Sequence, residues 1–230
     1  MISNYTNTTN TLNFTARPNL KKILPQVRAA FNKTLPDIQS PTRLHTFLSE
    51  TEKSARAAEI TELNNRTGFV RKFIDTLYRD GGLPEHFRGL IGIIKAFKAA
   101  NCSEYAEITK TILNLNGVKN CDMFAVFAKK KNQPPRALDH AIVALGIKKS
   151  HNNKKTQQLF QPPAGTKIID MWYDGYIGTI KGAHKKFREL GLQQDETILL
   201  KPLSTYEMDK EAKTVVKQAF PQLIIKNRTP

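Results

Sequence analysis

The 230-residue chain contains only two cysteines, Cys102 and Cys121, so it lacks the paired cysteines of a disulfide framework. It also lacks the run of about 20 apolar residues that a transmembrane helix needs, because its long uncharged stretches are rich in Asn and Thr. The first residues lack the basic start and apolar middle of a secretory signal peptide. We therefore expect a soluble protein without a signal peptide, and we exclude small disulfide-bonded scaffolds.

Acidic residues are also scarce: 20 Asp and Glu stand against 36 Lys and Arg, which gives a formal net charge of +16. Such an excess attracts nucleic acid, anionic lipid or an acidic protein, although a solvated basic surface explains it equally well. The basic residues carry no zinc-finger, helix-turn-helix or RNP-like motif. A basic protein that binds nucleic acid or a membrane without catalysis is the alternative function of another class.

What the chain does contain is a helical first half followed by short strands. Apolar residues recur at three- and four-residue spacing before residue 100, and Gly81-Gly82 ends one of these helices. Beyond it we predict helices over residues 101–115, 183–190 and 207–220, and strands over 121–128, 138–147 and 167–173. The predicted class is α+β with an antiparallel sheet. We divide the chain into a flexible lead (1–19), a helical N-terminal part (20–100) and a core with C-terminal helices (101–225), the last two forming one compact domain.

Cys102 lies where a helix is predicted to begin. Asn101 is a good N-cap residue, and Glu104 follows three positions later, as in a capping box. The positive end of a helix dipole favours a thiolate over a thiol, and the thiolate is the nucleophile. Cys121 lies in an apolar strand and is predicted to be structural.

His140 and Asp170 lie in two of the predicted strands, which places them within reach of each other if the strands are neighbours. A helix packed on the same face would aim Cys102 at His140, while Asp170 orients the imidazole from its other side. The alternative is structural: a lone cysteine or histidine is usually a core residue. Asp170, between Ile169 and Met171, is the hardest to explain that way, because a carboxylate in an apolar strand needs a partner.

Metal chemistry is not predicted. The two cysteines and the histidines have no C-x-x-C or H-x-x-x-H spacing. We expect neither a metal site nor a cofactor.

The order of these residues resembles that of the papain-like and transglutaminase-like thiol enzymes. The segments that carry the resemblance are Asn101-Cys102-Ser103-Glu104-Tyr105-Ala106, Asp139-His140-Ala141-Ile142-Val143 and Ile168-Ile169-Asp170-Met171-Trp172. The resemblance implies a papain-like or transglutaminase-like core with Cys102 as nucleophile, His140 as base and Asp170 as orienting acid. The chain looks most like the bacterial effectors of this superfamily, which implies translocation into host cytoplasm and a host protein as substrate.

The sequence departs from the papain pattern around the nucleophile. Papain relatives carry an upstream Gln that stabilises the oxyanion, but no Gln lies between Gln39 and Gln133. Backbone N–H groups near Cys102 and the side chain of Asn101 are the expected replacement. Trp172 either covers the triad from water or fills the core.

All the candidate reactions begin with attack of the Cys102 thiolate on an amide carbonyl, and the acceptor decides the outcome. We favour glutamine-directed transfer, as in a transglutaminase or a deamidase, because the distance from Cys102 to His140 and the Ile-Asp-x-Trp ending look transglutaminase-like. A papain-like cysteine protease is the alternative enzyme. The basic loop over residues 148–166 borders the cleft or forms a mobile hairpin tip, and an acidic regulatory protein that covers the cleft is a second expected partner.

Overall fold

The structure is a computed structural model that describes residues 19–147, 158–203 and 207–225. The predicted lead, apart from Asn19, lies outside the described residues, and so do residues 148–157 of the basic loop.

Helices form the first part of the described chain: α1 (Leu20–Thr34), α2 (Pro41–Phe47), α3 (Glu50–Ala55) and α4 (Ala57–Phe97). Asn19, Ser40 and Ser49 precede the first three, and each accepts a backbone N–H of the first turn through its side-chain oxygen. Pro41 at the first position of α2 needs no N–H partner there.

Helix α4 is a hairpin of two helical arms. The chain leaves helical geometry at Gly82, with φ 71° and ψ −161°, a conformation that favours glycine. The rings of Tyr78 and His86 lie 5.7 Å apart on either side of this turn, and those of Phe69 and Phe97, farther along the arms, lie 5.0 Å apart. The two arms are therefore antiparallel, and the predicted break at Gly81-Gly82 is where the chain reverses.

The second half of the chain builds one five-stranded antiparallel sheet in the order β4-β3-β2-β1-β5. Its strands are β1 (Cys121–Lys129), β2 (Arg136–Leu145), β3 (Lys167–Asp170), β4 (Tyr176–Thr179) and β5 (Thr197–Pro202). The remaining elements are α5 (Cys102–Leu115), α6 (Ile180–Arg188), α7 (Lys210–Ala219) and the short 3-10 helix η1 (Pro221–Leu223).

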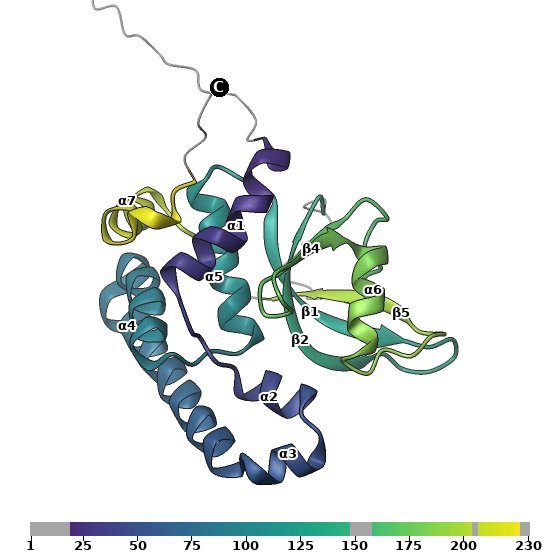
Figure 1. Cartoon of the computed structure of the whole chain (residues 1–230). Coiled ribbons are helices and arrows are strands. Elements are labelled where there is room, and N and C mark those ends of the chain that lie inside the picture. The colour runs from purple at the N-terminus through teal and green to yellow at the C-terminus, as the bar shows by residue number, and fades with distance from the viewer. Residues whose placement is uncertain (1–18, 148–157, 204–206, 226–230) are drawn as a thin grey trace, which may run out of the picture.

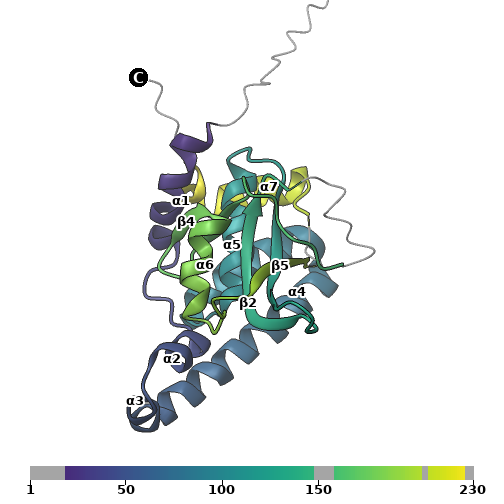
Figure 2. The ribbon, with the colours of Figure 1, turned by 90° about the vertical axis from the view of Figure 1, so that its right-hand side faces the viewer.

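The sheet is covered on both faces. Along β2, Val143 and Leu145 pack into a core with α1, α4, α5 and α7, whereas Ile142 and Ala144 pack into a second core with α6. This alternation gives three layers, with α6 on one side of the sheet and the other long helices on the opposite side (Figures 1 and 2). The fully buried α5 residues Ile108 and Ile112 place this helix against the middle of the sheet.

The predicted α+β class and the antiparallel sheet are confirmed. The third strand was predicted to reach residue 173, but it ends at Asp170, because the chain turns through residues 171–175 before β4. Strands β4 and β5 are missing from the prediction. Among the described helices, none combines the length and the hydropathy that crossing a bilayer demands.

Candidate active site

His140 and Asp170 form a buried pair. Their side chains are each 2% exposed, and His140 Nε2 lies 2.6 Å from Asp170 Oδ2. The register of β2 and β3 pairs Val143 with Ile169, so Asp170 lies on the same face of the sheet as His140 and diagonally across from it. The second carboxylate oxygen, Oδ1, accepts the backbone N–H of Tyr173 at 3.0 Å. Asp170 is thereby fixed by the turn that follows β3.

A bulge in β2 includes His140. Ala141 pairs with Ala125 of β1 and Ala137 pairs with Phe127, so three residues of β2 lie opposite one residue of β1. Asp139, within the bulge, has φ 50°, a left-handed conformation that Asp tolerates better than most residues. Such bulges bend a strand and redirect its side chains and carbonyls. Here the Asp139 carbonyl oxygen faces Cys102 Sγ at 3.9 Å.

Cys102 is the first residue of α5 and is partly exposed. Its sulfur lies close enough to His140 to raise the pKa of the imidazole. Because Asp170 occupies Nε2 of the imidazole, Nδ1 is the nitrogen left for the thiol. The structure thus brings together Cys102, His140 and Asp170, from α5, β2 and β3.

One prediction about how Cys102 reaches His140 is wrong. We predicted that the helix carrying Cys102 packs on the face of the sheet that carries His140 and Asp170. Helix α5 packs on the opposite face, whereas the His140 ring lies 5.7 Å from the ring of Phe187 in α6. Cys102 therefore meets His140 at the end of the sheet, where the bulge of β2 opens it, rather than across one face.

The pair favours a charged imidazole. Burial lowers the pKa of His140, but the Asp170 carboxylate and the Cys102 sulfur outweigh burial and raise this pKa to about 10. At neutral pH the imidazole therefore carries a proton beside the sulfur, as a thiolate–imidazolium pair requires.

Trp172 covers the imidazole. Its ring centroid lies 4.9 Å from that of His140, and the residue is 2% exposed. Its indole Nε1–H donates to Ser40 Oγ at 2.8 Å. Trp172 thus belongs to the core and lies against the His140 ring.

Ser40 joins three parts of the site, although the sequence analysis did not identify it. Besides accepting from Trp172, Ser40 Oγ donates to Asn101 Oδ1 at 2.9 Å and accepts the N–H of Arg43 at 3.2 Å. The residue is 4% exposed. The Ser-Pro start signal of α2 was present in the sequence, but nothing in it indicated contacts 61 residues away with Asn101 and 132 residues away with Trp172.

Asn101 lies directly before the nucleophile. Its Oδ1 accepts from Ser40 Oγ and from the N–H of Thr42, which leaves its amide nitrogen as the donor side of the group. Among the described residues, neither this amide nitrogen nor the N–H of Cys102 has an acceptor. These are the donors expected from the sequence at an oxyanion.

Arg71, on the first arm of α4, is a second residue that the sequence analysis missed. Its Nε donates to Glu104 Oε1 at 2.7 Å, and its Nη2 donates to Ser103 Oγ at 3.1 Å. The hydrogen bond with Glu104 is the largest cause that raises the pKa of Arg71. The charges of Glu104, Cys102 and Asp139 raise it further. Glu104 in turn accepts the N–H of Asn101 at 2.8 Å. A permanent cation therefore lies beside the first turn of α5.

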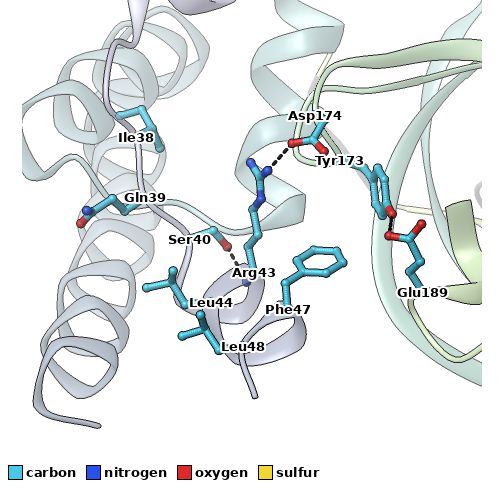
Figure 3. A pocket seen from close by; sticks show the side chains of 10 residues that line it. All are labelled: Ile38, Gln39, Ser40, Arg43, Leu44, Phe47, Leu48, Tyr173, Asp174 and Glu189. Carbon is cyan, nitrogen blue, oxygen red and sulfur yellow. Dashed lines mark hydrogen bonds and ion pairs between the residues drawn. The ribbon is translucent and has the colours of Figure 1, made fainter. Parts of the chain in front are cut away.

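Two pockets flank the site on the side of α2. One, of about 240 Å³, is lined by His140 and Trp172 together with residues of α2 and of the bulge. The other, of about 340 Å³, lies between α2 and the turn after β3, where Arg43 pairs with Asp174 and Phe47 faces Tyr173 (Figure 3). Glu189 lines both pockets. Helix α2 is thus a wall of the site.

Cys121 takes no part in this arrangement. It is 4% exposed, and burial raises the pKa of its thiol to about 12. No group of three or more His, Cys, Asp or Glu side chains in the described part of the chain is arranged to hold a metal ion.

Comparison of the chain with protein-family models, with curated proteins and with solved structures finds no match.

Proposed function

We propose that the protein is a thiol-dependent acyltransferase that acts on glutamine side chains of protein substrates. Cys102 is the nucleophile, His140 the general acid and base, and Asp170 the residue that orients and charges the imidazole. The observation that carries the proposal is the convergence of these side chains from three elements, with the His140–Asp170 pair buried and Cys102 accessible at a helix N-terminus.

The reaction follows from the positions of the groups. The Cys102 thiolate attacks the carbonyl carbon of a glutamine amide, and the N–H of Cys102 with the Asn101 amide stabilises the oxyanion. The protonated His140 donates its proton to the departing ammonia, which leaves a thioester on Cys102. His140 then removes a proton from the acceptor, which attacks the thioester and releases the thiolate.

The resemblance of the sequence to translocated bacterial effectors supports host proteins as the substrates. The test therefore exposes a eukaryotic cell extract to the wild-type protein, to Cys102→Ala and to the matched control Cys121→Ala. We expect ammonia release and modified glutamines with the wild type and with Cys121→Ala, and neither with Cys102→Ala. Mass spectrometry of the extract distinguishes a deamidated glutamine, a cross-link and a cleaved backbone.

Two outcomes would contradict the proposal. Equal modification by the wild type and by Cys102→Ala would show that the Cys102 thiol takes no part in the reaction. Cys102-dependent cleavage of backbone amides, without change at glutamine, would assign the site to a protease instead.

A further inference from the structure

The pocket of about 240 Å³ beside the site contains the base but not the nucleophile. His140 and Trp172 line it, together with Thr42 and Thr46 of α2. Cys102 is not among the residues that line it. The pocket therefore adjoins the imidazole and not the thiol.

Microscopic reversibility gives this side a function. The amine that leaves takes its proton from His140, and the acceptor that arrives gives its proton to the same imidazole. Leaving group and acceptor therefore pass through the same space, which adjoins His140. A pocket there selects the acceptor, because Asn101 and Cys102, which supply the oxyanion donors, are not among the described residues that line it.

The lining of the pocket suits a primary amine on an alkyl chain. Leu138, Trp172 and Leu190 offer apolar surface to methylene groups. Asp139 and Glu189 bring two carboxylates, whereas no Lys or Arg is among the described residues that line the pocket. This reverses the charge of a chain that has 36 Lys and Arg and only 20 Asp and Glu.

Glu189 is held in place for such a role. It accepts the hydroxyl of Tyr173 through Oε2, and it lies where this pocket meets the one in Figure 3. A carboxylate at this position attracts an ammonium group from solvent.

We propose that this pocket binds a primary amine as the acyl acceptor, so that the enzyme joins a lysine-like amine to the acyl group in preference to water. The inference rests on the proposed function of Cys102 and His140. In the transfer step the amine nitrogen forms a bond to the thioester carbon, and the bond from that carbon to Cys102 sulfur breaks. The bound ammonium first releases one proton to solvent, which frees the lone pair that attacks; the second proton passes to His140, and the electron pair of the broken bond stays on the thiolate.

The test separates the acceptor site from the unknown acyl donor. p-Nitrophenyl acetate acylates a reactive thiol directly, and release of p-nitrophenolate reports formation of the acetyl thioester on Cys102. n-Butylamine and tert-butylamine are then offered as acceptors. We expect formation of the N-alkylacetamide to saturate with n-butylamine, and to stay linear and slower with tert-butylamine, which has no extended alkyl chain to lie along the apolar lining. Saturation reports a binding site.

The charge of Glu189 is tested with Glu189→Gln. We expect the ratio of amide product to hydrolysis product at subsaturating n-butylamine to fall about tenfold, because the charge-assisted contact with the ammonium is lost. Glu211→Gln, the same change on the exposed surface of α7, serves as the matched control and is expected to leave the ratio as in the wild type.

Failure of the inference and failure of the proposed function are distinguishable. Linear dependence on both amines with equal slopes, or equal ratios for Glu189→Gln and Glu211→Gln, would overturn the amine pocket while a Cys102-dependent burst of p-nitrophenolate leaves the proposed function standing. A burst that persists unchanged in Cys102→Ala would overturn the proposed function itself.

Discussion

The two cysteines of this chain lie at opposite ends of the same helix. Cys102 is the first residue of α5, and Cys121 donates through Sγ to Asn114 Oδ1 and to the Val118 carbonyl, just beyond the other end. Because a helix dipole is positive at its N-terminus and negative at its C-terminus, α5 favours a negative charge on Cys102 and opposes one on Cys121.

The neighbours of the two thiols act in the same direction as the dipole. Cys102 meets the imidazole of His140 and lies near the guanidinium of Arg71. At Cys121, burial is the largest cause of a pKa raised to about 12; the nearby Asp122 carboxylate adds to it, and Lys110 opposes it only in part. The same residue type is thus a candidate nucleophile at one place and a core residue at the other, because of the helix end, the burial and the charges around it.

Alkylation of the folded protein tests this comparison most directly. At pH 7 we expect iodoacetamide to modify Cys102 at least about 10³-fold faster than Cys121, because only a thiolate reacts and the Cys121 thiol stays protonated. Mass spectrometry of peptides collected over time gives both rates. In denatured protein the two rates should converge, and equal rates in the folded protein would break the comparison.

Asp170→Asn removes the carboxylate charge that pairs with His140, the imidazole beside Cys102. Cys121 has no such neighbour among the described residues. The pKa of His140 is raised in the folded state to about 10, against about 6.5 in an unfolded chain. The folded state therefore holds this proton more tightly. The resulting stabilisation is complete below about pH 6.5 and is lost as the pH rises towards 10.

We therefore expect Asp170→Asn to lower the free energy of unfolding by about 3–5 kcal/mol at pH 6, the usual cost of breaking a buried ion pair. The difference from the wild type should narrow as the pH approaches 10. Urea denaturation at several pH values measures both effects. Asp195→Asn, which removes an exposed partner of Lys130, is the control. If the difference in the free energy of unfolding between the wild type and Asp170→Asn did not change with pH, that result would contradict a charged His140.

Ser40→Ala tests whether the Cys102 side of the molecule depends on α2. The change leaves the Trp172 indole N–H without its acceptor and Asn101 Oδ1 without one donor. We expect a loss of about 1–3 kcal/mol in the free energy of unfolding, together with a shift in the fluorescence of Trp172, the only tryptophan. Alkylation of Cys102 should slow and that of Cys121 should not.

Ser49→Ala is the matched control for this change. Ser49 also caps a helix, α3, but among the described residues its side chain forms hydrogen bonds only within that capping box. It should lower stability by about 1 kcal/mol and leave the fluorescence of Trp172 unchanged. Identical spectra for Ser40→Ala and the wild type would separate Ser40 from the site.

The class of the fold and the main elements could be predicted from the sequence because periodicity and breakers are local signals. The apolar spacing in α1 and α5 and the break at Gly81-Gly82 are examples. Strand β5 could not be predicted, because the short run of residues 197–202 becomes a strand by pairing with β1, about 70 residues earlier. The bulge at Asp139 is likewise a product of strand register, which a single strand does not contain.

The site shows the same division between local and tertiary information. Cys102, His140 and Asp170 could be selected because each residue type carries chemistry and lies in a readable context. Arg71 could not, because it is one of many basic residues on a helix. It reaches Glu104, 33 residues away, only through the way α4 packs beside α5.

Arg71→Met has the smallest expected effect. It tests what a single charged neighbour of Cys102 contributes to the difference between the two cysteines. The Arg71 side chain is 50% exposed, so solvent weakens its attraction for a thiolate, and we expect alkylation of Cys102 to slow by only about threefold at low salt. The difference should shrink in high salt, because the Debye length falls from about 30 Å at 0.01 M to about 3 Å at 1 M. Arg71→Lys keeps the cation and should restore most of the rate, whereas Lys72→Met, the next position on α4, should change nothing. A loss that ignores salt and persists in Arg71→Lys would mean that Arg71 acts by holding Glu104 and the first turn of α5 in place, and not by its charge on the sulfur.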